Sequence, residues 1–162
     1  MNSRGGLLCL PAVVMAFAAL SCSRPATAEQ FVRNADRDVY GRYVFDVDMS
    51  DSLAAYDISL LSSFSCIDRD FAPFVSMPLH LLWESPEGQC FEDNVVLPGS
   101  ALKDSSYYDK VLSDCLGEGL VPEKAGLWKL YVTAPEDSLR KYGMTGMGIR
   151  VDRKTKHEDG TR

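Results

Sequence analysis

The chain has 162 residues, a formal net charge of −6 at pH 7 and a composition that is 46% hydrophobic and 10% aromatic. This composition excludes a chain that is disordered throughout, and the length suits one ordinary domain with a real core. Net acidity without a basic stripe argues against a nucleic-acid partner and against electrostatic docking on anionic lipid.

Residues 1–21 have the layout of a signal peptide. Arg4 supplies a positive charge, and an uncharged apolar run of 14 residues extends from Leu7 to Leu20. This run is shorter than the roughly 20 residues that a membrane-spanning helix needs. The pattern therefore predicts export, with this segment removed.

Two cleavage sites compete at the end of this segment. Ala19-Leu20-Ser21-Cys22 reads as a lipobox, in which the cysteine receives the lipid, and Ala26-Thr27-Ala28 reads as an ordinary signal-peptidase site. We favour the lipobox because a cysteine stands directly at the end of the apolar run. The prediction is a lipoprotein anchored through Cys22 to the inner or outer membrane, with residues 22–38 as its lipidated N-terminus and tether. A soluble secreted form remains the alternative.

The first part of the mature chain contains two predicted strands. Residues 40–49 alternate between apolar and polar side chains, which is typical of a half-buried strand. Residues 50–52 form a turn, and residues 55–65 alternate in the same way. Residues 67–74 carry aromatic side chains without periodicity and are expected to form a loop.

A hairpin follows. Residues 77–84 and 90–97 both alternate with period two, and Pro86-Glu87-Gly88 between them has the composition of a turn. Pro98 and Gly99 then end the second strand.

The pattern changes after the hairpin. Residues 104–116 place apolar side chains at helical spacing, which predicts a short helix, with an irregular loop as the alternative. Residues 128–133 alternate as a strand, and residues 136–142 suit a helical turn closed by Gly143. Residues 145–152 form the last predicted strand.

Six strands at hairpin-like spacing with one short helix indicate an all-β fold. We expect an antiparallel β-sandwich of jelly-roll or immunoglobulin-like type over residues 39–152. Residues 153–162 are charged and poor in apolar side chains, so they are expected to form a disordered tail.

Three cysteines fall within the predicted domain: Cys66, Cys90 and Cys115. An odd number permits at most one disulfide within the chain, which an oxidising periplasm would allow. Buried free thiols are an equally good interpretation. No CxxC pair occurs and histidines are few, so we expect no metal site.

Motifs for catalysis or cofactor binding are weak. Counted from Asp46, an EF-hand loop would need Gly and Glu where Asp51 and Asp57 stand. The glycine-rich segment 143–148 precedes a strand instead of opening a helix, so it favours a bend over a phosphate loop. His80 lies mid-strand and no nucleophile in a recognisable context accompanies it. We therefore expect no cofactor and no enzymatic activity.

Exposed aromatic side chains would offer a different kind of site. Phe74, Tyr107 and Tyr108 are candidate aromatics for a sugar-binding platform of the kind that exported β-sandwiches sometimes carry. The competing interpretation is that most aromatic residues of this chain belong to the core.

Several segments occur in a fixed order that begins with the lipobox and spans most of residues 42–152. The segments are Ala19-Leu20-Ser21-Cys22, Val44-Phe45-Asp46-Val47-Asp48, Tyr56-Asp57-Ile58-Ser59-Leu60, Met77-Pro78-Leu79, Trp83-Glu84-Ser85-Pro86-Glu87-Gly88, Lys124-Ala125-Gly126-Leu127-Trp128-Lys129-Leu130 and Gly143-Met144-Thr145-Gly146-Met147-Gly148-Ile149-Arg150-Val151. In this order they resemble the gliding-motility lipoprotein GldH family of Bacteroidetes-type bacteria.

The resemblance implies a β-sandwich envelope lipoprotein without known catalytic residues, associated with a gliding or secretion apparatus. Its partners would be the membrane, through the lipid, and other envelope proteins. We therefore expect a non-catalytic structural or interaction component. A carbohydrate-binding accessory lipoprotein of the envelope is the alternative, and the identity of any small-molecule ligand stays open.

Overall fold

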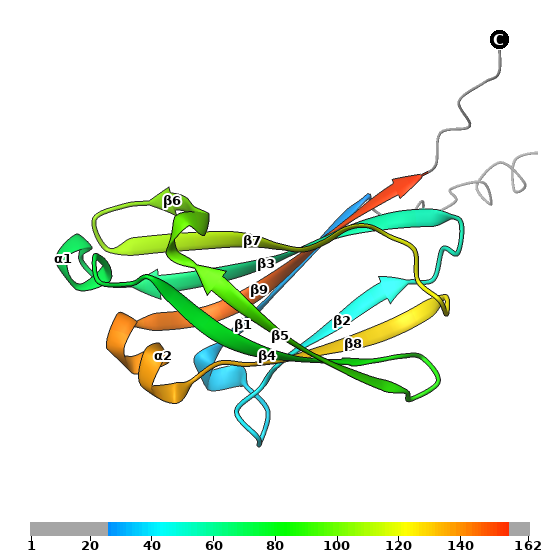
Figure 1. Ribbon diagram of the computed structural model, residues 1–162, viewed down its shortest axis with the longest axis horizontal. Coiled ribbons are helices and arrows are strands. Elements are labelled where there is room, and N and C mark those ends of the chain that lie inside the picture. The colour runs from blue at the N-terminus through cyan, green and yellow to red at the C-terminus, as the bar shows by residue number, and fades with distance from the viewer. Residues whose placement is uncertain (1–25, 156–162) are drawn as a thin grey trace, which may run out of the picture.

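The computed structural model describes residues 26–155, so the predicted signal peptide, Cys22 and the last part of the predicted tail lie outside the described residues. Two antiparallel sheets pack face to face (Figure 1). One sheet has the order β1-β9-β3-β7-β6 and comprises β1 (Thr27–Arg33), β3 (Ala54–Ser65), β6 (Leu102–Ser105), β7 (Asp109–Leu120) and β9 (Met144–Thr155). The other has the order β2-β8-β4-β5 and comprises β2 (Tyr43–Met49), β4 (Ser76–Glu84), β5 (Cys90–Pro98) and β8 (Gly126–Thr133).

The helical elements are short. They are α1 (Asp68–Phe71), α2 (Glu136–Tyr142) and two 3-10 turns at Asn34–Asp36 and Gly99–Ala101. The expected helical turn before the last strand is therefore present as α2. Gly143 ends it with a positive φ of 64°, a left-handed conformation that glycine adopts readily.

The strand order is that of a jelly roll. If the short edge strand β6 is left aside, the sheets read β1-β9-β3-β7 and β2-β8-β4-β5. The chain then crosses between the sheets at every connection except the β4–β5 hairpin, as in the double Greek key of that fold. The predicted antiparallel sandwich is thus confirmed, and the connections match the jelly-roll alternative.

The core lies between the sheets, and period-two alternation builds it. In β3 every second residue from Ala54 to Phe64 is buried, and β2 buries Tyr43, Phe45, Val47 and Met49 in the same way. Each fully buried large apolar side chain contributes about 1.5–3 kcal/mol. At one end Phe64, Phe71, Phe74 and Tyr142 pack ring against ring and close the core.

The sandwich has two distinct ends. Figure 1 shows α1 and α2 at one of them, called here the helix end. At the other, called the terminal end, Thr27 of β1 pairs with Asp152 of β9, and Ala54 pairs with Thr155. The β2–β3 turn brings Met49 to the same end. The chain therefore enters and leaves the domain at the terminal end.

The predicted helix at 104–116 is wrong, because these residues form β6 and most of β7. β7 pairs with β3 along most of its length, with register shifts near Ile58. Across that ladder the inward-facing positions of β7 include Lys110 and Asp114, which pair with the inward-facing Phe64 and Leu60 of β3. Charged residues on the inner face and a bulge remove the period-two pattern that would mark a strand.

The predicted tether is also too long, since residues 27–33 form β1, and β9 continues past 152 to Thr155. β1 has little buried surface, so its sequence carries no apolar alternation. Backbone pairing with β9 holds it instead. The amide of Gln30 additionally satisfies both backbone groups of Asp46 on the edge strand β2. Such contacts leave no signal in the sequence of β1 itself.

Candidate binding groove

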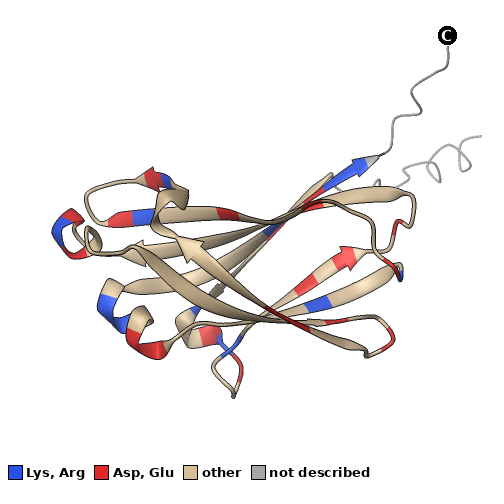
Figure 2. Cartoon of the chain, in the orientation of Figure 1, with Lys and Arg blue, Asp and Glu red and all other residues tan. Residues whose placement is uncertain are grey.

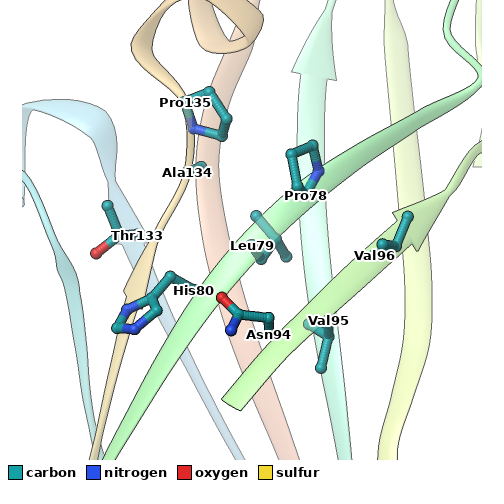
Figure 3. Close-up of a pocket in the computed structure, with 9 residues that line it drawn as sticks. All are labelled: Pro78, Leu79, His80, Asn94, Val95, Val96, Thr133, Ala134 and Pro135. Carbon is teal, nitrogen blue, oxygen red and sulfur yellow. The ribbon is translucent and has the colours of Figure 1, made fainter. Parts of the chain in front are cut away.

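A groove of about 350 Å³ opens on the outer face of the four-stranded sheet (Figure 3). We call it the sheet groove. Its lining is formed by Pro78, Leu79, His80, Asn94, Val95, Val96, Thr133, Ala134 and Pro135. These residues come from β4, β5, the end of β8 and the segment that joins β8 to α2.

Two prolines explain why the groove exists. β8 pairs with β4 only from Lys129 to Thr133, which lies opposite His80. Beyond Thr133 the chain turns through Pro135 into α2. Neither Pro135 nor Pro78 has an N–H to extend the ladder, so the two segments separate. The space between them becomes the groove.

A row of three polar side chains crosses the floor of the sheet groove. His80 of β4 lies directly opposite Thr133 of β8 on one side and Asn94 of β5 on the other. Figure 3 shows all three on the same side of the sheet, with Pro78 and Val96 beside them. An imidazole, a hydroxyl and an amide supply both donors and acceptors between apolar walls. This combination is typical of sites that orient a small ligand or a short peptide segment.

The charge in the groove is modest. His80 Nε2 lies 3.6 Å from Glu92 Oε2, and the two side chains are 44% and 71% exposed. An ion pair this exposed contributes at most about 1 kcal/mol even when the imidazole is protonated. Within residues 26–155 no hydrogen bond joins His80 to a hydroxyl or thiol nucleophile.

An ordered set of side chains continues the same sheet face towards β2. The Arg42 guanidinium lies between the rings of Tyr40 and Tyr131, 4.9 and 4.4 Å from their centroids, and pairs with Asp38 at 2.8 Å. The Tyr131 hydroxyl donates to Glu84 over 2.7 Å, and this hydrogen bond raises the pKa of Tyr131. Cation–π contacts and the carboxylate thus fix several large side chains beside the groove.

The predicted aromatic platform does not form as a set. Phe74 is buried and stacks on Phe71 at a centroid distance of 5.2 Å, so it belongs to the core. Tyr107 and Tyr108 are 63% and 61% exposed. Their rings stand nearly perpendicular, at 85°, so they share no plane.

The three cysteines are free thiols. Cys66 is half-buried, and its partial burial raises the pKa of its thiol. Cys90 is exposed on β5 of the four-stranded sheet, and Cys115 is exposed on β7 of the other sheet. No disulfide links them in the structure. Among residues 26–155 no group of three metal-binding side chains is clustered.

Sequence reasoning missed most of the groove. It gave His80 no catalytic role and assigned no role to Asn94, Thr133 or Pro135. The available signal was a proline inside one predicted strand and another two residues after the end of a second. Neither position reveals that the fold places them on opposite sides of one gap.

No helix within the described part of the chain is long and apolar enough to cross a membrane. Comparison of the chain with protein-family models, with curated proteins and with solved structures gave no match.

Proposed function

We propose that this protein is an exported, lipid-anchored and non-catalytic interaction module of the cell envelope. In this proposal Cys22 carries the lipid and the sheet groove receives a segment of another envelope protein. The order of segments that resembles the GldH family supports placement beside a gliding or secretion apparatus.

The observation that carries the binding role is the groove itself. Its volume of about 350 Å³ lies within the range of roughly 300–1,000 Å³ in which ligand sites are found. Apolar walls with a central polar row suit a short peptide segment that inserts an apolar side chain and hydrogen-bonds to His80, Asn94 or Thr133. The set offers no hydrogen-bonded nucleophile and base for bond cleavage.

The anchoring role draws support from the start of β1. Cleavage at the rival site after Ala28 would remove Thr27, whose hydroxyl donates to Asp152 over 2.5 Å. It would also remove two of the residues that pair with β9. Cleavage before Cys22 leaves this strand whole, which favours the lipobox.

Membrane fractionation of a Cys22→Ala variant tests the anchor. We expect the wild-type chain in the membrane fraction and the variant in the soluble fraction, with Cys115→Ala behaving like wild type. If Cys22→Ala stays in the membrane fraction, the anchor proposal fails.

Photo-crosslinking tests the groove. A benzophenone amino acid at position 94 should form an adduct of one defined mass with an envelope protein. The matched control places the same amino acid at position 115, which is exposed on the other sheet. Adding Val96→Trp should fill the groove and abolish the adduct. Equal adducts from positions 94 and 115 would contradict a role of the groove.

The exposed pair Tyr107 and Tyr108 favours a second candidate, an accessory carbohydrate-binding lipoprotein. A ring face of this size stacks well on the apolar face of a sugar. Glycan binding that is lost in Tyr107→Ala and retained in Phe74→Leu would support it. A glycan array without any signal would contradict the carbohydrate-binding candidate.

A further inference from the structure

An apolar crevice of about 210 Å³ lies between the two sheets at the terminal end. We call it the terminal crevice. Trp83 and Trp128 line it from the four-stranded sheet, and Leu120 and Val121 line it from the end of β7 and the segment that follows. Of the described residues that line it, Glu123 alone carries a charge.

The apolar rim of this crevice is open to solvent. Val121 is 67% exposed and Leu120 is 39% exposed. Leu53, in the β2–β3 turn at the same end, is 82% exposed. The indole N–H of Trp128 donates a hydrogen bond to the Lys124 carbonyl over 2.8 Å. An apolar partner could therefore contact the ring without leaving the indole N–H unpaired. Exposed apolar residues beside an apolar crevice are typical of an interaction surface.

Acidic and basic side chains form ion pairs around this end. Glu87 pairs with Lys124 at 3.3 Å, and Asp51 pairs with Arg153 at 3.7 Å. Figure 2 shows acidic and basic residues interspersed at this end of the described part of the chain. An uncharged or zwitterionic partner therefore fits better than anionic lipid, which attracts clusters of Lys and Arg.

The course of the chain identifies the partner. β1 begins at Thr27 at this end, and Cys22 lies five residues before it. A chain extends at most about 3.6 Å per residue, so the Cα of Cys22 lies no farther than about 18 Å from the Cα of Thr27. A lipid on Cys22 therefore brings the terminal end within reach of the membrane.

We propose that the terminal end is a membrane-contacting surface, on which Leu53, Leu120 and Val121 enter the interface of a zwitterionic phospholipid bilayer beside Trp83 and Trp128. The inference rests on the proposed anchor at Cys22. A crevice of about 210 Å³ is below the roughly 300 Å³ of ordinary ligand pockets, which favours insertion of its rim into lipid over enclosure of one lipid molecule. Tryptophan is also the residue most typical of the membrane interface.

The chain itself supplies the probe, because its two tryptophans, Trp83 and Trp128, both line the crevice. The experiment uses residues 22–162 with Cys22→Ser and an N-terminal hexahistidine, bound to phosphatidylcholine vesicles that contain nickel-chelating lipid. Bromine atoms on the acyl chains quench tryptophans that contact them. We expect tryptophan emission to be at least twofold lower on brominated than on unbrominated vesicles.

Val121→Asp and Leu53→Asp should each restore the emission. Val75→Asp is the matched control, since Val75 is 80% exposed at the helix end, and it should leave the quenching intact. Equal emission on the two kinds of vesicle, with normal circular dichroism, would overturn the inference. Quenching that Val121→Asp and Val75→Asp reduce equally would also overturn it. Because the histidine tag replaces the lipid, the result does not depend on whether Cys22 is lipidated, which fractionation decides separately.

Discussion

At the scale of single residues, three buried polar side chains differ in whether they have a hydrogen-bonding or ion-pair partner. Lys110 is 2% exposed and pairs with Asp68 at 2.8 Å. Ser85 is buried in the β4–β5 turn, where its hydroxyl accepts the Gln89 N–H over 3.0 Å. Ser62 is fully buried between the sheets, and its hydroxyl makes no hydrogen bond with the described residues. A buried polar group without a partner costs free energy, whereas a satisfied one does not.

The two serines should therefore respond oppositely to the same substitution. We expect Ser62→Ala to raise the free energy of unfolding by about 1 kcal/mol, because it removes an unsatisfied group. We expect Ser85→Ala to lower it by about 1 kcal/mol, because the Gln89 N–H loses its acceptor. Urea unfolding of the two variants measures both changes. A loss of stability in Ser62→Ala equal to that in Ser85→Ala would contradict this account.

Tyr43 makes stability depend on alkaline pH. Burial raises the pKa of Tyr43 to about 12, from an ordinary value of 10. A phenol with a raised pKa in the folded state holds its proton more tightly there. Its stabilising contribution is therefore complete below pH 10 and is lost as the pH rises towards 12.

The Tyr43→Phe variant tests this dependence. Between pH 10 and 12 its free energy of unfolding should fall less steeply than that of the wild type. At neutral pH the variant should be less stable by about 1 kcal/mol, because it loses the hydrogen bond from the Tyr43 hydroxyl to Asn34. Parallel pH profiles would show that Tyr43 does not titrate with folding.

At the scale of elements, β1 depends on the glycines of β9. Gly146 and Gly148 pair with Arg33 and Phe31, and the ring of Phe31 covers both of them. A Cβ at position 146 would stand 2.6 Å from the Val32 carbonyl oxygen and 2.6 Å from the Phe31 ring. The segment 143–148, predicted as a bend, is thus also a close-approach site for a second strand.

The Gly146→Ala variant should loosen β1 from the sheet. We expect a loss of about 1–3 kcal/mol in the free energy of unfolding, because the backbone must move to admit the methyl group. Trypsin should also cleave after Arg33 faster than in the wild type, as mass spectrometry of the fragments would show. Thr145→Ala, at an exposed neighbouring position, is the control. An unchanged cleavage rate would mean that β1 stays paired with β9 despite the added methyl group.

At the scale of the whole molecule, the core and the jelly-roll connections hold the two sheets together, and no disulfide joins the sheets within residues 26–155. The chain crosses from one sheet to the other repeatedly, and a core that includes Phe45, Leu60 and Leu130 fills the space between them. Cys90 and Cys115 belong to different sheets and are free. Stability should therefore not rely on oxidation.

We expect the urea midpoint of the mature chain to be the same with and without a thiol reductant. The mass of the monomer should show three alkylatable thiols in the domain, with Cys66 reacting more slowly than Cys90 and Cys115. Burial, which raises the pKa of the Cys66 thiol, is the reason. A reductant-sensitive midpoint would indicate a disulfide within the chain.

The sequence by itself determined the elements whose side chains alternate between core and solvent. β2, β3, β4, β8 and β9 each bury one face, so their apolar side chains recur with period two. β5 alternates in sequence as well, although Leu97 is its only buried residue. α2 and the Gly143 that ends it could also be predicted from the sequence, because helix ends require particular residues. The predicted export signal and the proposed lipidation of Cys22 rest on local sequence patterns, which can be recognised without the fold.

Only the tertiary structure decided the parts that depend on distant segments. β1 is held by backbone pairing with β9. Lys110 on the inner face of β7 is held by an ion pair with Asp68 of α1. Backbone hydrogen bonds and ion pairs between remote residues leave no period in a sequence. The sheet groove and the terminal crevice likewise arise where strands separate. Which side chains face such a gap is fixed by strand order, and the residues of any one strand do not encode it.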